Sequence, residues 1–124
     1  QDGYIPLSQT ATFSSDTPLS EAKAIINDSH YSRYPVYVNQ PDNIIGYVHA
    51  KDLLNESVES LSEITHDILT VDLSTKCHTV LEQMKQLHVH IALVKSSNQI
   101  HGIITMENIL ENIVGDIQDE HDQH

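Results

Sequence analysis

The sequence lacks tryptophan and has little cysteine, positive charge or continuous apolar sequence. Cys77 is the one cysteine among 124 residues, which excludes an internal disulfide and indicates a reducing compartment. Six Lys and Arg stand against 18 Asp and Glu, and this net charge of −12 at pH 7 makes nucleic acids and anionic lipid surfaces poor partners. No apolar run approaches the ~20 residues that cross a bilayer, and no signal-peptide segment opens the chain. We therefore expect a soluble, cytoplasmic module with an aliphatic core, cut from a larger protein.

The chain contains an internal repeat. Each half carries a β-rich run, a polar turn, a second β-rich run and the start of a helix: Tyr34–Val38, Ile44–Val48 and Lys51–Leu54 in the first half, His90–Val94, Ile100–Ile104 and Glu107–Leu110 in the second. Gly46 corresponds to Gly102 and Asp52 to Asn108, each 56 residues later. The sequence thus predicts two tandem copies of one structural unit.

Each copy is expected to begin with a short strand and an amphipathic helix. Strands are predicted at Ala11–Phe13 and Leu69–Val71, and apolar residues recur at helical spacing over Leu19–Ile26 and Val80–Leu87. With a last helix near Lys51 or Met106, each copy has the order β-α-β-β-α. A helix covers only one face of a three-stranded sheet, so we expect an α/β (α+β) fold in which the two copies cover each other with pseudo-twofold symmetry.

The expected domain boundaries follow the repeat. They are a first repeat with its N-terminal flank at 1–57, a linker at 58–66, and a second repeat with an acidic tail at 67–124. Val58 and Leu61 in the polar linker region would either extend a helix or pin this segment to the core.

These motifs resemble a tandem pair of CBS domains, the regulatory module called a Bateman unit. The segments His30–Tyr37 and Asp42–Leu54 are similar to the first repeat of the CorC/CNNM-like magnesium and cobalt efflux and hemolysin-related proteins, and Gly102–Ile117 is similar to the second. The resemblance covers Ala11 to Glu120. It implies an adenosine nucleotide (ATP or AMP, with or without Mg²⁺) between the repeats, a homodimer, and a parent membrane domain N-terminal to this segment.

Thr105 and Asn108 form the stronger candidate half-site for a nucleotide. Vicinal ribose hydroxyls need a short carboxylate or amide beside a hydroxyl, and the first turn of the following helix favours an anion. The family pattern of Gly, Thr or Ser, and Asp, spaced by two residues, is similar to Gly102-x-x-Thr105-x-x-Asn108, with an amide in place of the acid. Alternatively, Thr105 is a helix N-cap and Asn108 satisfies backbone donors. Both roles can hold at once.

The first repeat carries a weaker half-site, in which the acid Asp52 is kept and His49 replaces the hydroxyl. The resemblance also implies contacts from the opposite repeat: Tyr31, Ser32 and Arg33 for the stronger half-site, and Leu87, His88 and Val89 for the weaker one. Arg33, the only arginine, would grip a phosphate, or it is a surface cation paired with acids. Since residues 87–89 offer no strong phosphate ligand, we expect at most one good nucleotide site.

Nine histidines raise the question of a metal site. His88, His90 and His101 are candidates, but no CxxC or HExxH motif supports them, so we expect surface residues and no dedicated metal. The tail Asp116–His124 is either a frayed acidic end or a weak binder of divalent cations.

No catalytic motif stands out, and we expect no enzyme. Cys77 lies near a helix start without an identifiable base, and no Ser-His-Asp spacing, Walker loop or paired-carboxylate motif is present. The main hypothesis is a regulatory module of a divalent-cation (Mg/Co) efflux-type or hemolysin-related membrane protein. A ligand-free dimerisation scaffold and a direct divalent-cation sensor remain as alternatives.

Overall fold

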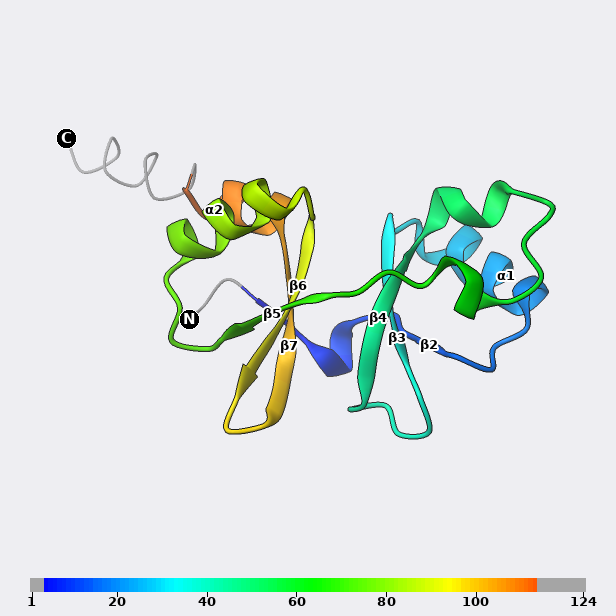
Figure 1. Cartoon of the computed structure of the whole chain (residues 1–124), viewed down its shortest axis with the longest axis horizontal. Coiled ribbons are helices and arrows are strands. Elements are labelled where there is room, and N and C mark those ends of the chain that lie inside the picture. The colour runs from blue at the N-terminus through cyan, green and yellow to red at the C-terminus, as the bar shows by residue number, and fades with distance from the viewer. Residues whose placement is uncertain (1–3, 114–124) are drawn as a thin grey trace. The chain divides into compact units, whose positions relative to one another are not determined.

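The structure is a computed structural model of the chain, and it describes residues 4–113 (Figure 1). Its contacts divide the chain into two compact units. The repeat-1 unit is Thr10–Ile68, and the repeat-2 unit joins the residues up to Gln9 to those from Leu69 onward. The predicted acidic tail, Asp116–His124, lies outside the described residues, as do the last residues of the second family motif.

The repeat-1 unit contains a three-stranded sheet in the order β2-β3-β4. Its strands are β2 (Phe13–Ser14), β3 (Arg33–Tyr37) and β4 (Ile44–His49). Strand β3 runs parallel to β2 and antiparallel to β4. Helix α1 (Leu19–Ser29) connects β2 to β3 and ends where His30 takes a left-handed conformation, φ 61°. The predicted strand-helix-strand-strand order of this repeat is therefore confirmed.

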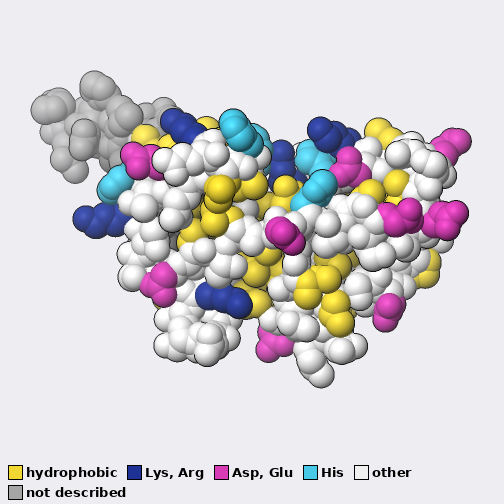
Figure 2. Space-filling view, viewed as in Figure 1, with side chains coloured by type: hydrophobic (Ala, Val, Ile, Leu, Met, Phe, Trp, Pro, Cys, Tyr) yellow, Lys and Arg dark blue, Asp and Glu magenta, His cyan; other side chains and the backbone are white. Residues whose placement is uncertain are grey.

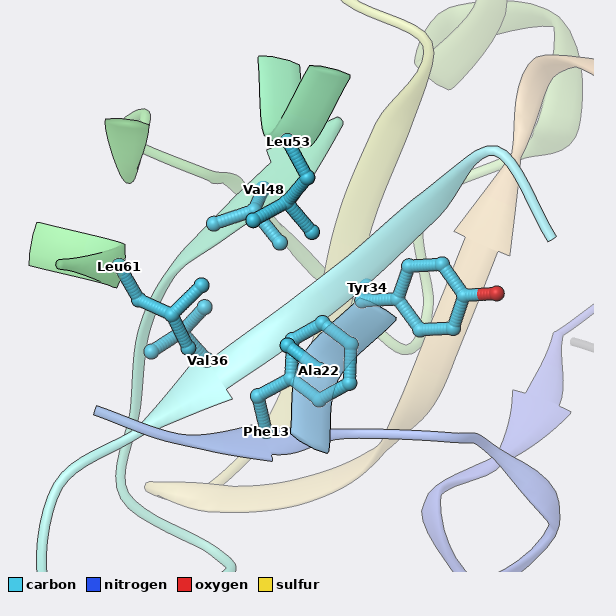
Figure 3. Packing of buried hydrophobic residues seen from close by; sticks show 7 residues of the cluster. All are labelled: Phe13, Ala22, Tyr34, Val36, Val48, Leu53 and Leu61. Atoms are coloured by element: carbon cyan, nitrogen blue, oxygen red, sulfur yellow. The ribbon is translucent and has the colours of Figure 1, made fainter. Parts of the chain in front are cut away.

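The core of the repeat-1 unit is mostly aliphatic, as expected, around one aromatic pair (Figure 3). The rings of Phe13 and Tyr34 stack with centroids 4.9 Å apart. The Tyr34 hydroxyl lies at the edge of this core, 2.8 Å from Ser29 Oγ, and accepts the Tyr31 N–H at 3.0 Å. Burial of the largest core side chain thus leaves its polar atom hydrogen-bonded.

The last helix of the first repeat is shorter than predicted. The segment Ala50–Leu54 forms a 3₁₀ helix, η2, instead of an α-helix. Asn55 ends it, because its side-chain oxygen accepts the N–H and the hydroxyl of Ser57 and forms a local turn that competes with helix continuation.

The predicted linker is pinned to the repeat-1 core. It contains a second 3₁₀ helix, η3 (Leu61–Ile64), with a capping box in which Glu63 accepts the N–H of Ser60 at 2.8 Å. Leu61 is fully buried in the core cluster that also contains Val36 and Val48. Of the two roles considered for this residue, pinning the segment is the one confirmed.

The repeat-2 unit contains a four-stranded sheet in the order β1-β7-β6-β5. Its strands are β1 (Ile5–Pro6), β5 (Leu69–Asp72), β6 (Ile91–Ser96) and β7 (Gln99–Thr105). The short 3₁₀ helix η1 (Leu7–Gln9) follows β1, helix α2 (Cys77–Leu87) connects β5 to β6, and residues 106–113 are helical after β7. The predicted β-α-β-β-α order is confirmed in this repeat. As in the first repeat, the strand before the helix is parallel to the next strand, and the last two strands are antiparallel.

In each sheet, the last strand of the repeat has one free edge, and a segment from outside that repeat pairs with this edge. The segment is the one that leads into the other repeat. Ile5 and Pro6 pair with Ile103 and Gly102 of β7, and His66 forms an antiparallel bridge with Tyr47 of β4. From the sequence, the N-terminal flank is grouped with the first repeat; in the structure, β1 belongs to the second repeat's sheet. Pairing between strands distant in sequence leaves no local sequence signal.

The two repeat glycines permit these edge pairings. A Cβ on Gly46 would overlap the carbonyl oxygen of His66, and a Cβ on Gly102 would overlap that of Ile5. Glycine is required at both positions because another backbone passes where a side chain would lie.

Replacing Gly46 by alanine is expected to lower the free energy of unfolding by about 1–3 kcal/mol, because the added methyl forces the His66 segment away. Denaturant unfolding measures this change, with Ile45→Val as the control, since Ile45 is exposed on the same strand. Equal stability of Gly46→Ala and the wild type would contradict the close approach.

Leu61→Ala is expected to destabilise the chain by about 2–5 kcal/mol, since it leaves a cavity in the repeat-1 core. The matched control is Leu54→Ala, because Leu54 is 82% exposed and its loss is expected to cost no more than about 0.5 kcal/mol. Thermal or denaturant unfolding compares the two variants. Similar effects for both would show that the linker is not pinned by Leu61.

Candidate functional site

Thr105 and Asn108 lie at the junction between β7 and the helix at 106–113, and they bond to each other. The Thr105 hydroxyl donates to Asn108 Oδ1 at 2.6 Å, the Thr105 N–H donates to the same oxygen at 3.3 Å, and the Asn108 N–H donates to Thr105 Oγ1 at 3.2 Å. This arrangement resembles a capping box, with the shorter Asn in the place of Glu or Gln. The capping role is therefore present, whereas nucleotide binding by the same residues stays a prediction.

The capping box leaves part of each side chain available. Both residues are half-buried, so their polar groups are within reach of a solute. Within residues 4–113, no acceptor bonds the Asn108 Nδ2 group, which keeps two N–H donors. The junction thus offers amide donors and a hydroxyl oxygen with a remaining lone pair, side by side at a helix N-terminus.

The corresponding residues of the first repeat are arranged differently. His49 Nδ1 accepts the Lys51 N–H at 3.2 Å and so caps η2. Asp52 Oδ2 lies 3.1 Å from Nε2 of His66. In the weaker half-site, the histidine therefore caps η2 and the carboxylate is within hydrogen-bond distance of His66.

Several titratable groups surround the end of β4. Arg33 lies opposite His49 in the register of β3 and β4. Burial lowers the pKa of His49 below its ordinary value, and the positive charges of Arg33 and Lys51 lower it further, while Asp52 opposes them. We call Arg33, His49, Lys51, Asp52 and His66 the β4-end cluster.

Other predicted contact residues are held within their own units. In the repeat-1 unit, Tyr31 is 56% exposed and the Ser32 carbonyl accepts the Ala50 N–H at 2.8 Å, which holds this segment against the end of β4. In the repeat-2 unit, His88 ends α2 in a left-handed conformation and the Val89 N–H donates to the Met84 carbonyl at 3.0 Å. Which half-site each segment serves stays a prediction.

The histidines considered for a metal do not form a cluster. His90 is 3.9 Å from Glu107, whereas His101 packs against Tyr4. Throughout residues 4–113, no three His, Cys, Asp or Glu side chains come together as a metal site would require.

Over this same range, no helix is long and apolar enough to span a membrane.

His66 is the residue of this region that sequence reasoning missed. It lies 14 positions from Asp52, and its approach depends on the bridge to Tyr47. No motif spacing reports a contact of that kind.

Comparison with known proteins decides the family. Residues 5–59 and 58–115 each match the CBS domain. The chain belongs to the CBS domain family. The tandem CBS pair predicted from the sequence is thereby confirmed, and so is the fold class.

The CBS pair is similar to proteins of the CorC and hemolysin type. It is 34% identical over 128 residues to the magnesium and cobalt efflux protein CorC of Vibrio cholerae, covering 98% of this chain and 44% of that protein. It is 38% identical over 100 residues to Hemolysin C of Brachyspira hyodysenteriae, covering 78% of this chain and 37% of that protein. The chain thus spans less than half the length of these relatives.

Solved CBS structures share the fold. The CBS domain of the bacterial CNNM/CorC family Mg²⁺ transporter in complex with ATP has a TM-score of 0.84 and 28% identity, covering 90% of this chain and 84% of that one. The hemolysin-like CBS protein of Oenococcus oeni has a TM-score of 0.82 and 28% identity, covering 89% of this chain and 85% of that one.

The lowered pKa of His49 predicts a loss of stability in mild acid. The unfolded chain binds this proton more readily than the folded chain does, so the free energy of unfolding falls as the pH drops below about 6.5. His49→Asn keeps a capping acceptor without the titration and is expected to weaken this pH dependence. His30→Asn, at an exposed left-handed position that Asn tolerates, is the control.

Denaturant unfolding at intervals from pH 7 to pH 5 provides the measurement. An unchanged pH dependence in His49→Asn would contradict the assigned role of His49.

Proposed function

We propose that this CBS pair is a regulatory module that binds an adenosine nucleotide, ATP or AMP, with or without Mg²⁺. The residues proposed to hold it are Thr105 and Asn108, together with Tyr31, Ser32 and Arg33. The observation that carries the proposal is the half-buried hydroxyl–amide pair at the β7–helix junction, whose Asn108 Nδ2 keeps its donors. The ATP complex of a similar CBS domain supports the class of ligand.

Each proposed residue has a distinct task. Asn108 Nδ2 would donate to one ribose hydroxyl, and Thr105 Oγ1 would accept from the neighbouring one. Arg33 would contribute a guanidinium for a phosphate, since its planar donors match phosphate oxygens. Because an amide replaces the family's carboxylate, the ribose bonds lack charge assistance and are expected to be weaker.

The charge of the chain affects the choice of nucleotide. A net charge of −12 opposes a polyphosphate at long range. Figure 2 shows the Asp and Glu side chains scattered over the visible face instead of gathered in one patch. Salt screens such exposed charges beyond about 8 Å, and bound Mg²⁺ would neutralise part of the ATP charge. AMP meets less repulsion than ATP without Mg²⁺.

The proposed role is regulatory and not catalytic. In this proposal the CBS pair is a cytoplasmic part of a membrane protein of the magnesium and cobalt efflux or hemolysin-related type, with the membrane domain N-terminal to it. The ligand would shift the geometry of the pair only by the difference in its affinity for two arrangements.

A ligand-free homodimerisation scaffold is the second candidate function. Exposed leucines recur at equivalent positions of the two repeats, since Leu54 is 82% exposed and Leu110 is 46% exposed, and they are 56 residues apart. Exposed apolar side chains favour association with another protein surface where they form one contiguous patch. Nucleotide binding and dimerisation are compatible in one module.

Titration calorimetry with ATP and AMP tests the nucleotide proposal through Asn108. Asn108→Ala is expected to weaken binding about tenfold or more, because the amide that donates to the ribose hydroxyl is lost. Asn108→Asp is expected to strengthen binding by up to about tenfold, because a carboxylate accepts charge-assisted bonds. Asn112→Ala, an exposed position on the same helix, is the matched control.

The outcomes separate the candidate functions. Absence of a heat signal with millimolar ATP and AMP, with and without Mg²⁺, would contradict nucleotide binding and favour the ligand-free dimerisation scaffold. Binding of Mg²⁺ or Co²⁺ without nucleotide would select the direct cation sensor. Equal affinity of Asn108→Ala and Asn112→Ala would remove Asn108 from the site.

A further inference from the structure

His66, a histidine from the segment between the repeats, contacts Asp52, the carboxylate of the first-repeat half-site. His66 Nε2 lies 3.1 Å from Asp52 Oδ2, and the exposed fractions of the two side chains are 52% and 30%. Asp52 corresponds to Asn108, the residue proposed to hold the ribose in the second repeat. The group that would make the first repeat competent for a ribose is therefore already paired.

The backbone fixes His66 beside Asp52. The His66 N–H donates to the Tyr47 carbonyl at 2.8 Å, and the Tyr47 N–H donates to the His66 carbonyl at 2.9 Å. The imidazole also packs against the Tyr47 ring, with centroids 5.3 Å apart. The bridge between His66 and Tyr47 therefore holds the His66 backbone where its side chain can reach Asp52.

The second repeat has an apolar residue at the position of His66. Tyr47 pairs with His66, whereas Ile103, 56 residues after Tyr47, pairs with Ile5. Ile5 has no polar side-chain atom and cannot engage Asn108. The two repeats thus have the same edge pairing, but only the first places a hydrogen-bonding side chain there.

We infer that His66 blocks nucleotide binding at the first-repeat half-site by forming a hydrogen bond with Asp52. The nucleotide therefore binds at Thr105 and Asn108. This inference rests on the proposed function. A ribose at the first repeat would have to displace the imidazole from Asp52, and it would find His49 committed to capping η2.

The test is the number of AMP molecules bound per chain, measured by calorimetry on the whole chain. The wild type is expected to bind one. His66→Ile copies the residue found at the equivalent place in the second repeat and frees Asp52, so a second, weaker molecule is expected. His66→Gln keeps an N–H donor for Asp52 and is expected to bind one.

The double variant Asp52→Ala/His66→Ile is expected to return to one, because the freed carboxylate is gone. A purely structural role for His66 would not add a binding site. His66→Ala carries the same test should His66→Ile not fold, as judged by thermal unfolding.

The possible results separate this inference from the proposed function. One AMP bound by the wild type and still one by folded His66→Ile and His66→Ala would overturn the inference alone. No binding by the wild type but Asp52-dependent binding by His66→Ile would overturn the proposed site at Thr105 and Asn108 and support only the closure of the first-repeat half-site by His66. No binding by any variant would overturn both.

Discussion

The structure depends on two close backbone approaches, one between His66 and Gly46 and one between Ile5 and Gly102. At each glycine, a segment from outside the repeat pairs with the last strand of the sheet, which a side chain would prevent. This pairing takes the N-terminal residues into the repeat-2 sheet and holds the linker on the repeat-1 sheet. It also brings His66 beside Asp52 of the first-repeat half-site.

The two repeats share a backbone design and differ in what their polar groups do. In the second repeat, Thr105 and Asn108 bond to each other, and within residues 4–113 the Asn108 Nδ2 group keeps its donors. In the first repeat, His49 caps η2 and Asp52 contacts His66. Duplication supplied the same junction twice, and side-chain changes made the two junctions unequal. Two repeats with similar backbones therefore carry two chemically different junctions.

Much of the fold could be predicted from the sequence because its signals are local. β-rich runs and helical apolar spacing located the strands β2 to β7 and the helices α1 and α2, and the repeat related their copies, whereas β1 was not predicted. The 3₁₀ form of Ala50–Leu54 was not predicted, because it depends on the turn made by Asn55. The capping alternative for Thr105 was predictable from spacing, whereas the Asp52–His66 pair was not, because it requires the Tyr47 bridge.

The claim that one of two similar junctions serves the nucleotide is tested most directly by a crystal structure of this chain grown with AMP. We expect the ribose on Asn108 and Thr105, with the imidazole of His66 still within hydrogen-bond distance of Asp52. A ribose bound to Asp52 with His66 turned away, while Asn108 stays unoccupied, would contradict the assignment.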